Sequence, residues 1–171
     1  MVSSTAAAAV AVAILIWTPE AEAQDLSGRA TVVDGDTLIV EGVKPRIRLY
    51  GIDTPEKKQT CEDEDGRRYL CGGRAAEALA EILGRNGRVR CTEEDRDRYG
   101  RIVAECRTRD GTVINEELVR RGWALEYDAY SDGRYGAAQA SARRAKRGLW
   151  AGRFEAPWDW RRAQRKKTAG G

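Results

Sequence analysis

Two acidic clusters flank an alternating run of apolar residues between positions 34 and 56. Apolar and polar residues alternate on both sides of a turn at residues 42–45, which is the pattern of a β-hairpin. The apolar positions are Leu38, Val40, Ile47 and Leu49. A hairpin brings its two ends together, so we expect Asp36 and Asp53 to lie side by side. Two carboxylates at short distance repel each other unless a cation holds them, and oxygen ligands favour a hard ion, Ca²⁺ or Mg²⁺.

Residues 1–23 have the composition of a secretory signal peptide. They contain a mostly apolar run from Ala6 to Trp17, followed by Ala21-Glu22-Ala23, which has the small-x-small form of a signal-peptidase site. The apolar run is too short to span a membrane. No Lys or Arg precedes it, so an N-terminal anchor and a cytosolic tail stay open as alternatives. We expect removal of residues 1–23 and a mature protein that is secreted or periplasmic, in the bacterial envelope, without stable membrane association.

The chain contains no histidine. This excludes the commonest general base, the usual zinc ligand and every Ser-His or Cys-His nucleophilic pair. Any chemistry must therefore use carboxylates, arginines, tyrosines or a metal. The formal net charge is +3, and residues 1–23 contribute two acidic residues and no basic ones. The remaining chain is therefore more basic, which suits a polyanionic partner and equally suits a solvated charged surface.

The sequence contains four cysteines, Cys61, Cys71, Cys91 and Cys106. A secreted chain favours disulfides, and the lack of a CxxC spacing disfavours zinc, while free thiols remain the alternative. Residues 87–93 and 101–107 predict two strands joined by a turn centred near residues 98 and 99. Opposite residues of an antiparallel pair are equidistant from the turn, which places Cys91 opposite Cys106. The other predicted pair is Cys61 with Cys71, across a polar loop.

The remaining pattern predicts an α+β fold. Residues 28–33 predict a strand before the hairpin, and the charged segment 57–69 predicts an exposed loop. Helical patterns that end at glycines cover residues 72–83, 113–121 and about 135–147. The order three strands, helix, two strands, helix is typical of a five-stranded OB-type β-barrel with about three helices, an architecture that binds oligonucleotides and oligosaccharides.

We assign residues 24–150 to this OB-type domain and residues 151–171 to a basic C-terminal tail that contains tryptophans. Aromatic residues near the end of the chain are Trp150, Phe154, Trp158 and Trp160. We expect them to pack on the barrel, with stacking on nucleic-acid bases as the alternative.

Four motifs in order resemble the thermonuclease, or staphylococcal-nuclease-like, family across about residues 28–150. They are Val33-Asp34-Gly35-Asp36-Thr37, the run from Arg48 through Asp53-Thr54-Pro55-Glu56, Asp97-Arg98-Tyr99-Gly100-Arg101, and Asn115-Glu116-Glu117-Leu118-Val119-Arg120. The resemblance implies a Ca²⁺-dependent phosphodiesterase that cleaves DNA and RNA. It also implies that Asp36 and Asp53 are direct metal ligands, with the Thr54 carbonyl as a third ligand and Asp34 in the outer shell.

The same resemblance implies how substrate is bound. Arg48 and Arg101 would bind the scissile phosphate, Glu56 would act on the attacking water, and Tyr99 and Tyr130 would contact nucleotide. A further family tyrosine is replaced by Asp128, and Tyr127 lies one residue away from that position. Phosphodiester chemistry supports these roles independently, because an anionic substrate needs positive charge in its transition state and guanidinium groups match phosphate oxygens.

Each motif also has a structural interpretation. Asp34-Gly35-Asp36 can be only a turn, Asp53–Glu56 a helix start, and Asp97–Arg101 a hairpin tip with an ion pair. The favoured hypothesis is a secreted, monomeric, sequence-nonspecific nuclease that acts on DNA and RNA with Ca²⁺. The alternatives are a non-catalytic OB-type module that binds nucleic acid or another polyanion, and a structural domain without a ligand. Clustered acids favour the nuclease, because they would repel the ligand of a purely binding module.

Overall fold

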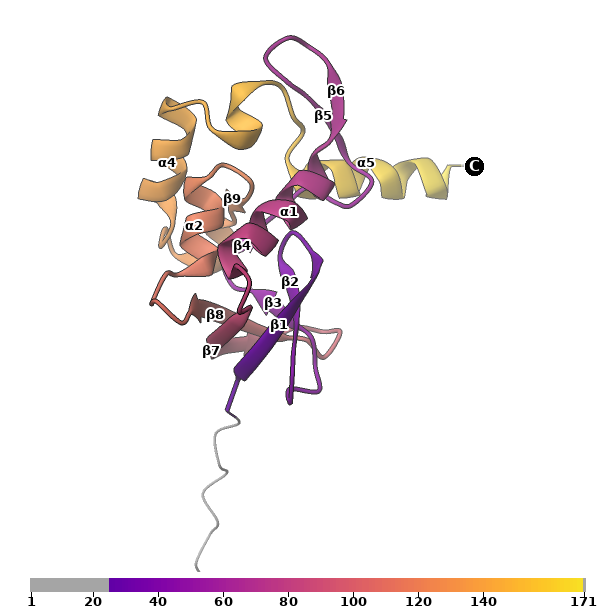
Figure 1. Cartoon of the computed structure of the whole chain (residues 1–171). Coiled ribbons are helices and arrows are strands. Elements are labelled where there is room, and N and C mark those ends of the chain that lie inside the picture. The colour runs from indigo at the N-terminus through magenta and orange to yellow at the C-terminus, as the bar shows by residue number, and fades with distance from the viewer. Residues whose placement is uncertain (1–24, 171) are drawn as a thin grey trace, which may run out of the picture.

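Residues 25–170 are described by the computed structural model, so the predicted signal peptide lies outside the described residues. Five strands form a closed barrel in the order β1-β2-β3-β8-β7 (Figure 1). The strands are β1 (Ser27–Asp34), β2 (Thr37–Val40), β3 (Ile47–Leu49), β7 (Arg88–Arg96) and β8 (Ile102–Thr108). Neighbouring strands are antiparallel except β3 and β8, which are parallel. The predicted α+β fold with a five-stranded OB-type barrel is therefore confirmed.

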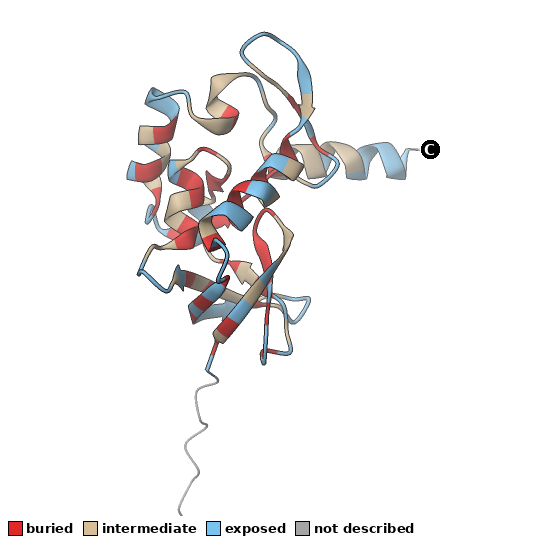
Figure 2. Ribbon diagram, in the orientation of Figure 1, coloured by how far each residue is buried: buried red, intermediate tan, exposed pale blue. Residues whose placement is uncertain are grey.

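The predicted hairpin is formed by β2 and β3. Leu38 lies opposite Ile47, and Thr37 lies opposite Arg48. All four predicted apolar positions of the hairpin are buried. Buried residues gather inside the barrel and on the helix faces that meet it (Figure 2). The register places Asp36, directly before β2, beside the end of β3, where the chain continues toward Asp53.

Helices cover one side and one end of the barrel. They are α1 (Cys71–Leu83), α2 (Ile114–Arg120), α3 (Asp128–Ser131), α4 (Gly136–Arg144), the 3-10 helix η1 (Gly148–Ala151) and α5 (Pro157–Ala169). Helices α1, α2 and α4 were predicted, whereas α3, η1 and α5 were not. Helix α5 extends away from the barrel beside the hairpin formed by β5 and β6 (Figure 1). None of the helices within residues 25–170 is long and apolar enough to cross a membrane.

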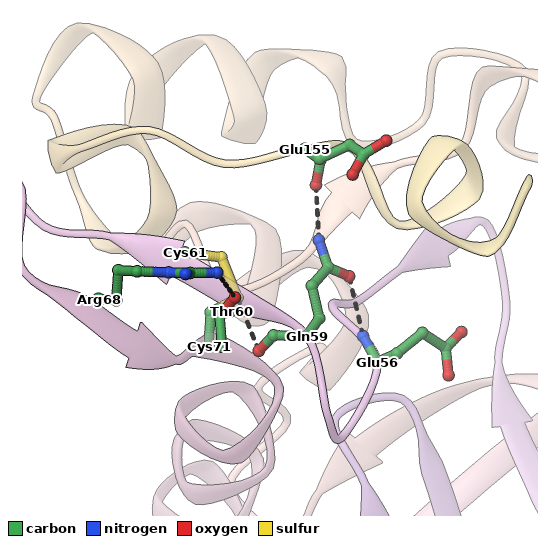
Figure 3. The surroundings of a disulfide bond; sticks show 7 residues. All are labelled: Glu56, Gln59, Thr60, Cys61, Arg68, Cys71 and Glu155. Carbon is green, nitrogen blue, oxygen red and sulfur yellow. Dashed lines mark hydrogen bonds between the residues drawn. A yellow bond between two sulfur atoms is a disulfide. The ribbon is translucent and has the colours of Figure 1, made fainter. Parts of the chain in front are cut away.

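The prediction of a loop at residues 57–69 was wrong. This segment contains β5 (Thr60–Glu62), which pairs with β6 (Arg68–Leu70) in a two-stranded antiparallel sheet. The buried Gln59 side chain also fixes the segment, because its Nε2 donates a hydrogen bond of 2.7 Å to the Glu155 carbonyl (Figure 3). The Cys61–Cys71 disulfide and the hydrogen bond to the Glu155 carbonyl therefore order this segment, which has no apolar alternation of its own.

Both predicted disulfides are present, Cys61–Cys71 and Cys91–Cys106. Cys91 and Cys106 are register partners of β7 and β8, as equal spacing from the turn requires. The Cys61–Cys71 bridge belongs to a second apolar cluster with Leu125 and Leu149. Trp150, Phe154 and Trp158 pack against this second cluster and not against the barrel core, where they were expected.

A buried amide ties the barrel to α2. Asn115 Oδ1 accepts a hydrogen bond of 3.0 Å from the Cys106 N–H, and its Nδ2 donates to the carbonyls of Tyr50 at 2.9 Å and Ala104 at 3.3 Å. Tyr50 directly follows β3 and leads into β4 (Ile52–Asp53), which pairs with β9 (Leu125–Glu126). Asn115 thus fixes the backbone that carries Asp53.

We expect Asn115→Ala to lower the free energy of unfolding by about 3 kcal/mol, because three hydrogen bonds are lost and their backbone partners stay buried. Urea denaturation of the oxidised protein measures this change. The exposed Asn86 offers a matched control, and Asn86→Ala should change stability by less than about 0.5 kcal/mol. Equal stability of the two variants would show that the Asn115 amide does not hold this part of the backbone.

Candidate functional site

Asp36 and Asp53 converge on one guanidinium. Arg48 contacts Asp36 Oδ2 through Nη1 at 2.8 Å and Asp53 Oδ1 through Nη2 at 2.9 Å. Asp53 is fully buried and Asp36 is nearly so. Burial raises the pKa of Asp36 above its ordinary value, and the Arg48 charge only partly opposes this rise. The predicted proximity of the two acids is therefore present, and their charges depend on a cation between them.

A second guanidinium, that of Arg161 in α5, binds the same carboxylate. Its Nη2 lies 2.6 Å from Asp53 Oδ2, and its Nη1 lies 3.0 Å from Asp53 Oδ1 and 2.8 Å from Glu56 Oε1. Burial acts to lower the pKa of Arg161, but the hydrogen bonds to Asp53 and Glu56 outweigh it and raise the pKa above the usual value. Arg161 therefore stays positively charged and links the carboxylate of Asp53, in β4, to that of Glu56.

The turn before β2 packs closely against Thr54. A Cβ atom at Gly35 would lie 2.6 Å from Thr54 Oγ1, so only glycine allows this approach. Asp34 Oδ1 accepts a hydrogen bond of 3.3 Å from the Asp36 N–H, which closes the turn. Asp34, Asp36 and Thr54 therefore meet at one end of the barrel.

Contacts of the Glu56 backbone N–H and carbonyl fix the position of this residue. Its N–H donates to Gln59 Oε1 at 3.2 Å, and its carbonyl lies against the first turn of α1, where a Cβ at Gly72 would come within 2.1 Å of it. The carboxyl group is half-buried, and Arg161 contacts its Oε1. Glu56 therefore lies beside Asp53, with both side chains bound to the same guanidinium.

Arg101 is held by an ion pair of its own. Its Nε lies 2.7 Å from Asp97 Oδ2, and its N–H donates to Asp97 Oδ1 at 3.0 Å. Arg48 and Val103 are partners of the parallel β3–β8 pair. Arg101 directly precedes β8 and lies two positions before Val103. Within residues 25–170, Arg101 contacts neither Asp36 nor Asp53. Residues 97–101 form a hairpin tip with an ion pair, as the structural interpretation of this motif describes.

The two predicted nucleotide-contact tyrosines are exposed, Tyr99 at 71% and Tyr130 at 59%. Tyr99 lies at the tip of the β7–β8 hairpin, with Arg98 and Arg101 over its ring at 5.0 and 5.8 Å. Tyr130 contacts Tyr127 at a centroid distance of 5.1 Å, and Tyr127 stacks on Trp158 of α5 at 5.4 Å. An aromatic row thus joins Tyr130 to α5.

The donor set fits a hard cation. Asp36, Asp53 and the Thr54 carbonyl offer only oxygen, and the two buried carboxylates already require a positive partner, which Arg48 and Arg161 supply. No group of three or more acidic, cysteine or histidine side chains within the described residues has the geometry of a metal site. Both oxygens of Asp53 accept hydrogen bonds from guanidinium groups, so a metal ion would have to displace at least one of them.

Sequence reasoning missed Arg161 and Gln59. Gln59 joins Glu56 to Glu155, and Arg161 reaches Asp53 across more than one hundred residues of chain. No local pattern predicts either contact. The helix that positions Arg161 did have local signals, namely Pro157 at its start, Asp159 in its first turn and lysines in its last turn.

Comparison with known proteins matches residues 46–152 to the family model described as staphylococcal nuclease homologue. The chain is 38% identical over 142 residues to the succinoglycan biosynthesis protein ExoI of Rhizobium meliloti (strain 1021), covering 83% of this chain and 73% of the relative. It is also 38% identical over 142 residues to an uncharacterized endonuclease of Escherichia coli, covering 80% of this chain and 86% of the relative. A probable staphylococcal-like nuclease of Oryza sativa subsp. japonica, CAN1, is 38% identical over 130 residues, covering 74% of this chain and 35% of the relative.

Proposed function

The chain belongs to the staphylococcal nuclease family, and from this membership and the geometry of the site we propose that it hydrolyses phosphodiester bonds of DNA and RNA with the help of Ca²⁺. The observation that supports the proposal most is the convergence of Asp36, Asp53 and Glu56 on the guanidinium groups of Arg48 and Arg161. A module that only binds polyanions needs cations and aromatic rings, and buried acids would weaken such binding.

Metal binding is assigned to Asp36, Asp53 and the Thr54 carbonyl. Bound there, Ca²⁺ would supply positive charge beside the phosphate and favour ionisation of a nearby water. Asp34 supports this set by closing the turn that presents Asp36.

Phosphate binding is assigned to Arg48 and Arg101. A guanidinium has five N–H donors, and Arg48 uses two of its nitrogens on Asp36 and Asp53 while its side chain stays 22% exposed. It therefore keeps donors for phosphate oxygens. Arg101 is 28% exposed at the start of β8, the strand that pairs with that of Arg48, and it would exchange its Asp97 ion pair for the phosphate.

Glu56 is the candidate to orient the attacking water or accept its proton. Arg161 binds Oε1 of Glu56 and keeps the carboxyl group beside Asp53. The exposed rings of Tyr99 and Tyr130 are the candidate nucleotide contacts. Bases stack well on such rings irrespective of sequence, which fits a nuclease without sequence preference.

We place the mature protein outside the cytoplasm, as a monomer in the periplasm or the medium. The two disulfides support this location, because such bridges persist in oxidising compartments. Mass spectrometry of exported protein would test it through an N-terminus at Gln24.

Metal and phosphate binding can be separated by mutation. We expect Asp36→Ala to abolish the stabilisation that Ca²⁺ gives to the wild-type protein, which is about 2.7 kcal/mol at one hundred times the dissociation constant. Arg48→Ala should retain at least that stabilisation, because the arginine binds phosphate and shares the oxygens of Asp36 and Asp53 with the ion. Thermal unfolding at a series of Ca²⁺ concentrations measures both effects. Unchanged Ca²⁺ binding by Asp36→Ala would contradict the metal assignment.

The direct test of activity is cleavage of supercoiled plasmid DNA and of single-stranded RNA by purified wild-type protein. We expect cleavage of both substrates with Ca²⁺ and none with EDTA, and the Mg²⁺ arm establishes which ion is used. A protein that binds these nucleic acids in Ca²⁺ without cleaving them would be a binding module, contrary to the proposal.

A further inference from the structure

A groove runs between α5 and the β5–β6 hairpin. Its volume is about 540 Å³, and its lining includes Lys58, Arg68, Glu155, Trp160, Gln164 and Lys167. We call it the α5 groove. On the helix side, Trp160, Gln164 and Lys167 recur at the spacing of one helical face, which extends the groove about 10 Å along α5. Its α5 wall lies beyond the residues that match the family model.

The α5 groove begins beside the candidate active site. Trp160 is followed directly by Arg161, which binds Asp53 and Glu56. On the other side, Gln59 accepts from the Glu56 N–H through Oε1 and donates to the Glu155 carbonyl through Nε2 (Figure 3). Groove residues on both walls, Trp160 on one and Lys58 and Thr60 on the other, are therefore next in sequence to residues that contact Asp53 or Glu56.

The charges in the α5 groove are suited to an anionic strand. Lys58, Arg68 and Lys167 line it against a single acid, Glu155. Among residues 25–170, none of these three cations forms an ion pair, and Arg68 makes only a hydrogen bond to Thr60 at 3.1 Å. Unpaired cations beside a half-buried tryptophan are the combination that binds single-stranded nucleic acid, through phosphate contacts and base stacking.

We propose that the α5 groove binds the nucleic-acid strand on one side of the scissile bond. Lys58, Arg68 and Lys167 contact its phosphates, and the Trp160 ring stacks on a base. This inference rests on the proposed nuclease function and adds a substrate subsite to it. A strand that enters the groove must pass Arg161, so substrates longer than a dinucleotide gain contacts that the catalytic residues alone do not offer.

The test is equilibrium binding of a fluorescent single strand of about 12 nucleotides, measured by anisotropy at several salt concentrations. All proteins in this binding assay also carry Glu56→Gln, which slows cleavage by about 100-fold or more, and Ca²⁺ is present. We expect Lys58→Gln with Lys167→Gln to weaken binding about tenfold and to reduce the salt slope by about 1.4, the value for two lost contacts to a single strand. Lys44→Gln with Lys146→Gln removes the same charge away from the groove and should change neither quantity.

Two further variants separate the contacts. Trp160→Ala should weaken binding at least about fivefold at an unchanged salt slope, because stacking involves no charge. Glu155→Gln should strengthen binding, since it removes the one repelling charge. A gain in affinity cannot result from misfolding, so this variant keeps the test valid if the others are unstable.

A wild-type protein that neither cleaves nor binds nucleic acid would refute the proposed function itself. If wild-type protein cleaves DNA while the paired lysine variant keeps its affinity and salt slope, the nuclease assignment stands and the α5 groove is not part of the substrate site. Cleavage of a dinucleotide diester, too short to reach the groove, should be equal in the wild-type protein and in a paired lysine variant that keeps Glu56. A loss of dinucleotide cleavage would mean that the lysines act on the catalytic residues and would contradict the subsite.

Discussion

Glu56→Gln is expected to lower kcat by about 100-fold or more with little change in substrate affinity. The amide has the shape of the carboxyl group, and its oxygen can still accept the hydrogen bond from Arg161 Nη1, which spans 2.8 Å in the wild-type protein. What is lost is the negative charge that orients the attacking water or accepts its proton. Single-turnover cleavage and equilibrium binding of a short labelled oligonucleotide separate the two quantities.

Glu77→Gln is the matched control for this experiment. Glu77 lies exposed on α1 and pairs only with Arg74 among the described residues, at 2.7 Å. Its substitution should leave cleavage unchanged. If Glu56→Gln binds substrate much more weakly yet cleaves at the normal rate once saturated, Glu56 only anchors substrate and the chemistry belongs to another group.

The second large effect concerns Ca²⁺ affinity, which two substitutions should change in opposite directions. Asp53→Asn should weaken Ca²⁺ binding more than about 100-fold, because it removes a charged ligand, and ligand-supporting residues alone contribute 10- to 100-fold. Arg161→Gln should strengthen it about tenfold, because the guanidinium otherwise competes for Asp53 Oδ1 and Oδ2 at 3.0 and 2.6 Å. Isothermal titration of the substrate-free protein with Ca²⁺ measures both without depending on catalysis.

Arg162→Gln controls for the loss of a positive charge from α5. Arg162 is exposed and pairs with Asp159 at 3.3 Å, so its substitution should leave Ca²⁺ affinity nearly unchanged. If Arg161→Gln binds Ca²⁺ no better than Arg162→Gln does, the ion does not share the oxygens of Asp53 with Arg161.

The barrel and both disulfides could be predicted because their signals are local. Alternation of apolar residues in β2 and β3 requires one buried face, and equal spacing from a turn determines that Cys91 lies opposite Cys106. The convergence of Asp36 and Asp53 followed from the same hairpin. The roles of Asp36, Asp53 and Thr54 as metal ligands stay predictions, as does the action of Glu56 on the attacking water.

The missed parts depend on contacts between distant segments. The β5–β6 hairpin has no apolar periodicity, and the Cys61–Cys71 bridge and the Gln59 contact to Glu155 order it instead. The basic composition of residues 151–171 suggested a tail, although Pro157 and the terminal charges are helix signals. That Arg161 would meet Asp53 depends on how α5 packs, which no short motif specifies.

The position of Arg101 is a different case. Sequence similarity identified the residue, and the structure shows it directly before β8 and bound to Asp97. The two side chains of this ion pair are 28% and 19% exposed, so the Arg101 guanidinium can still be reached from the solvent. We propose that a phosphate replaces Asp97 as the partner of Arg101. The local sequence motif alone does not show which of these two partners the arginine binds.

The most direct measurement is hydrolysis of a DNA oligonucleotide by wild-type protein in water enriched with oxygen-18, with Ca²⁺ present, followed by mass spectrometry of the products. DNA has no 2′-hydroxyl group that could attack the phosphate internally. Attack by water at phosphorus predicts one heavy oxygen on the new terminal phosphate formed at each cleavage, an unlabelled hydroxyl at the other new end, and no products when EDTA replaces Ca²⁺. Products without heavy oxygen on the phosphate, or no cleavage of DNA in Ca²⁺, would contradict a metal-assisted phosphodiesterase at Asp36, Asp53 and Glu56.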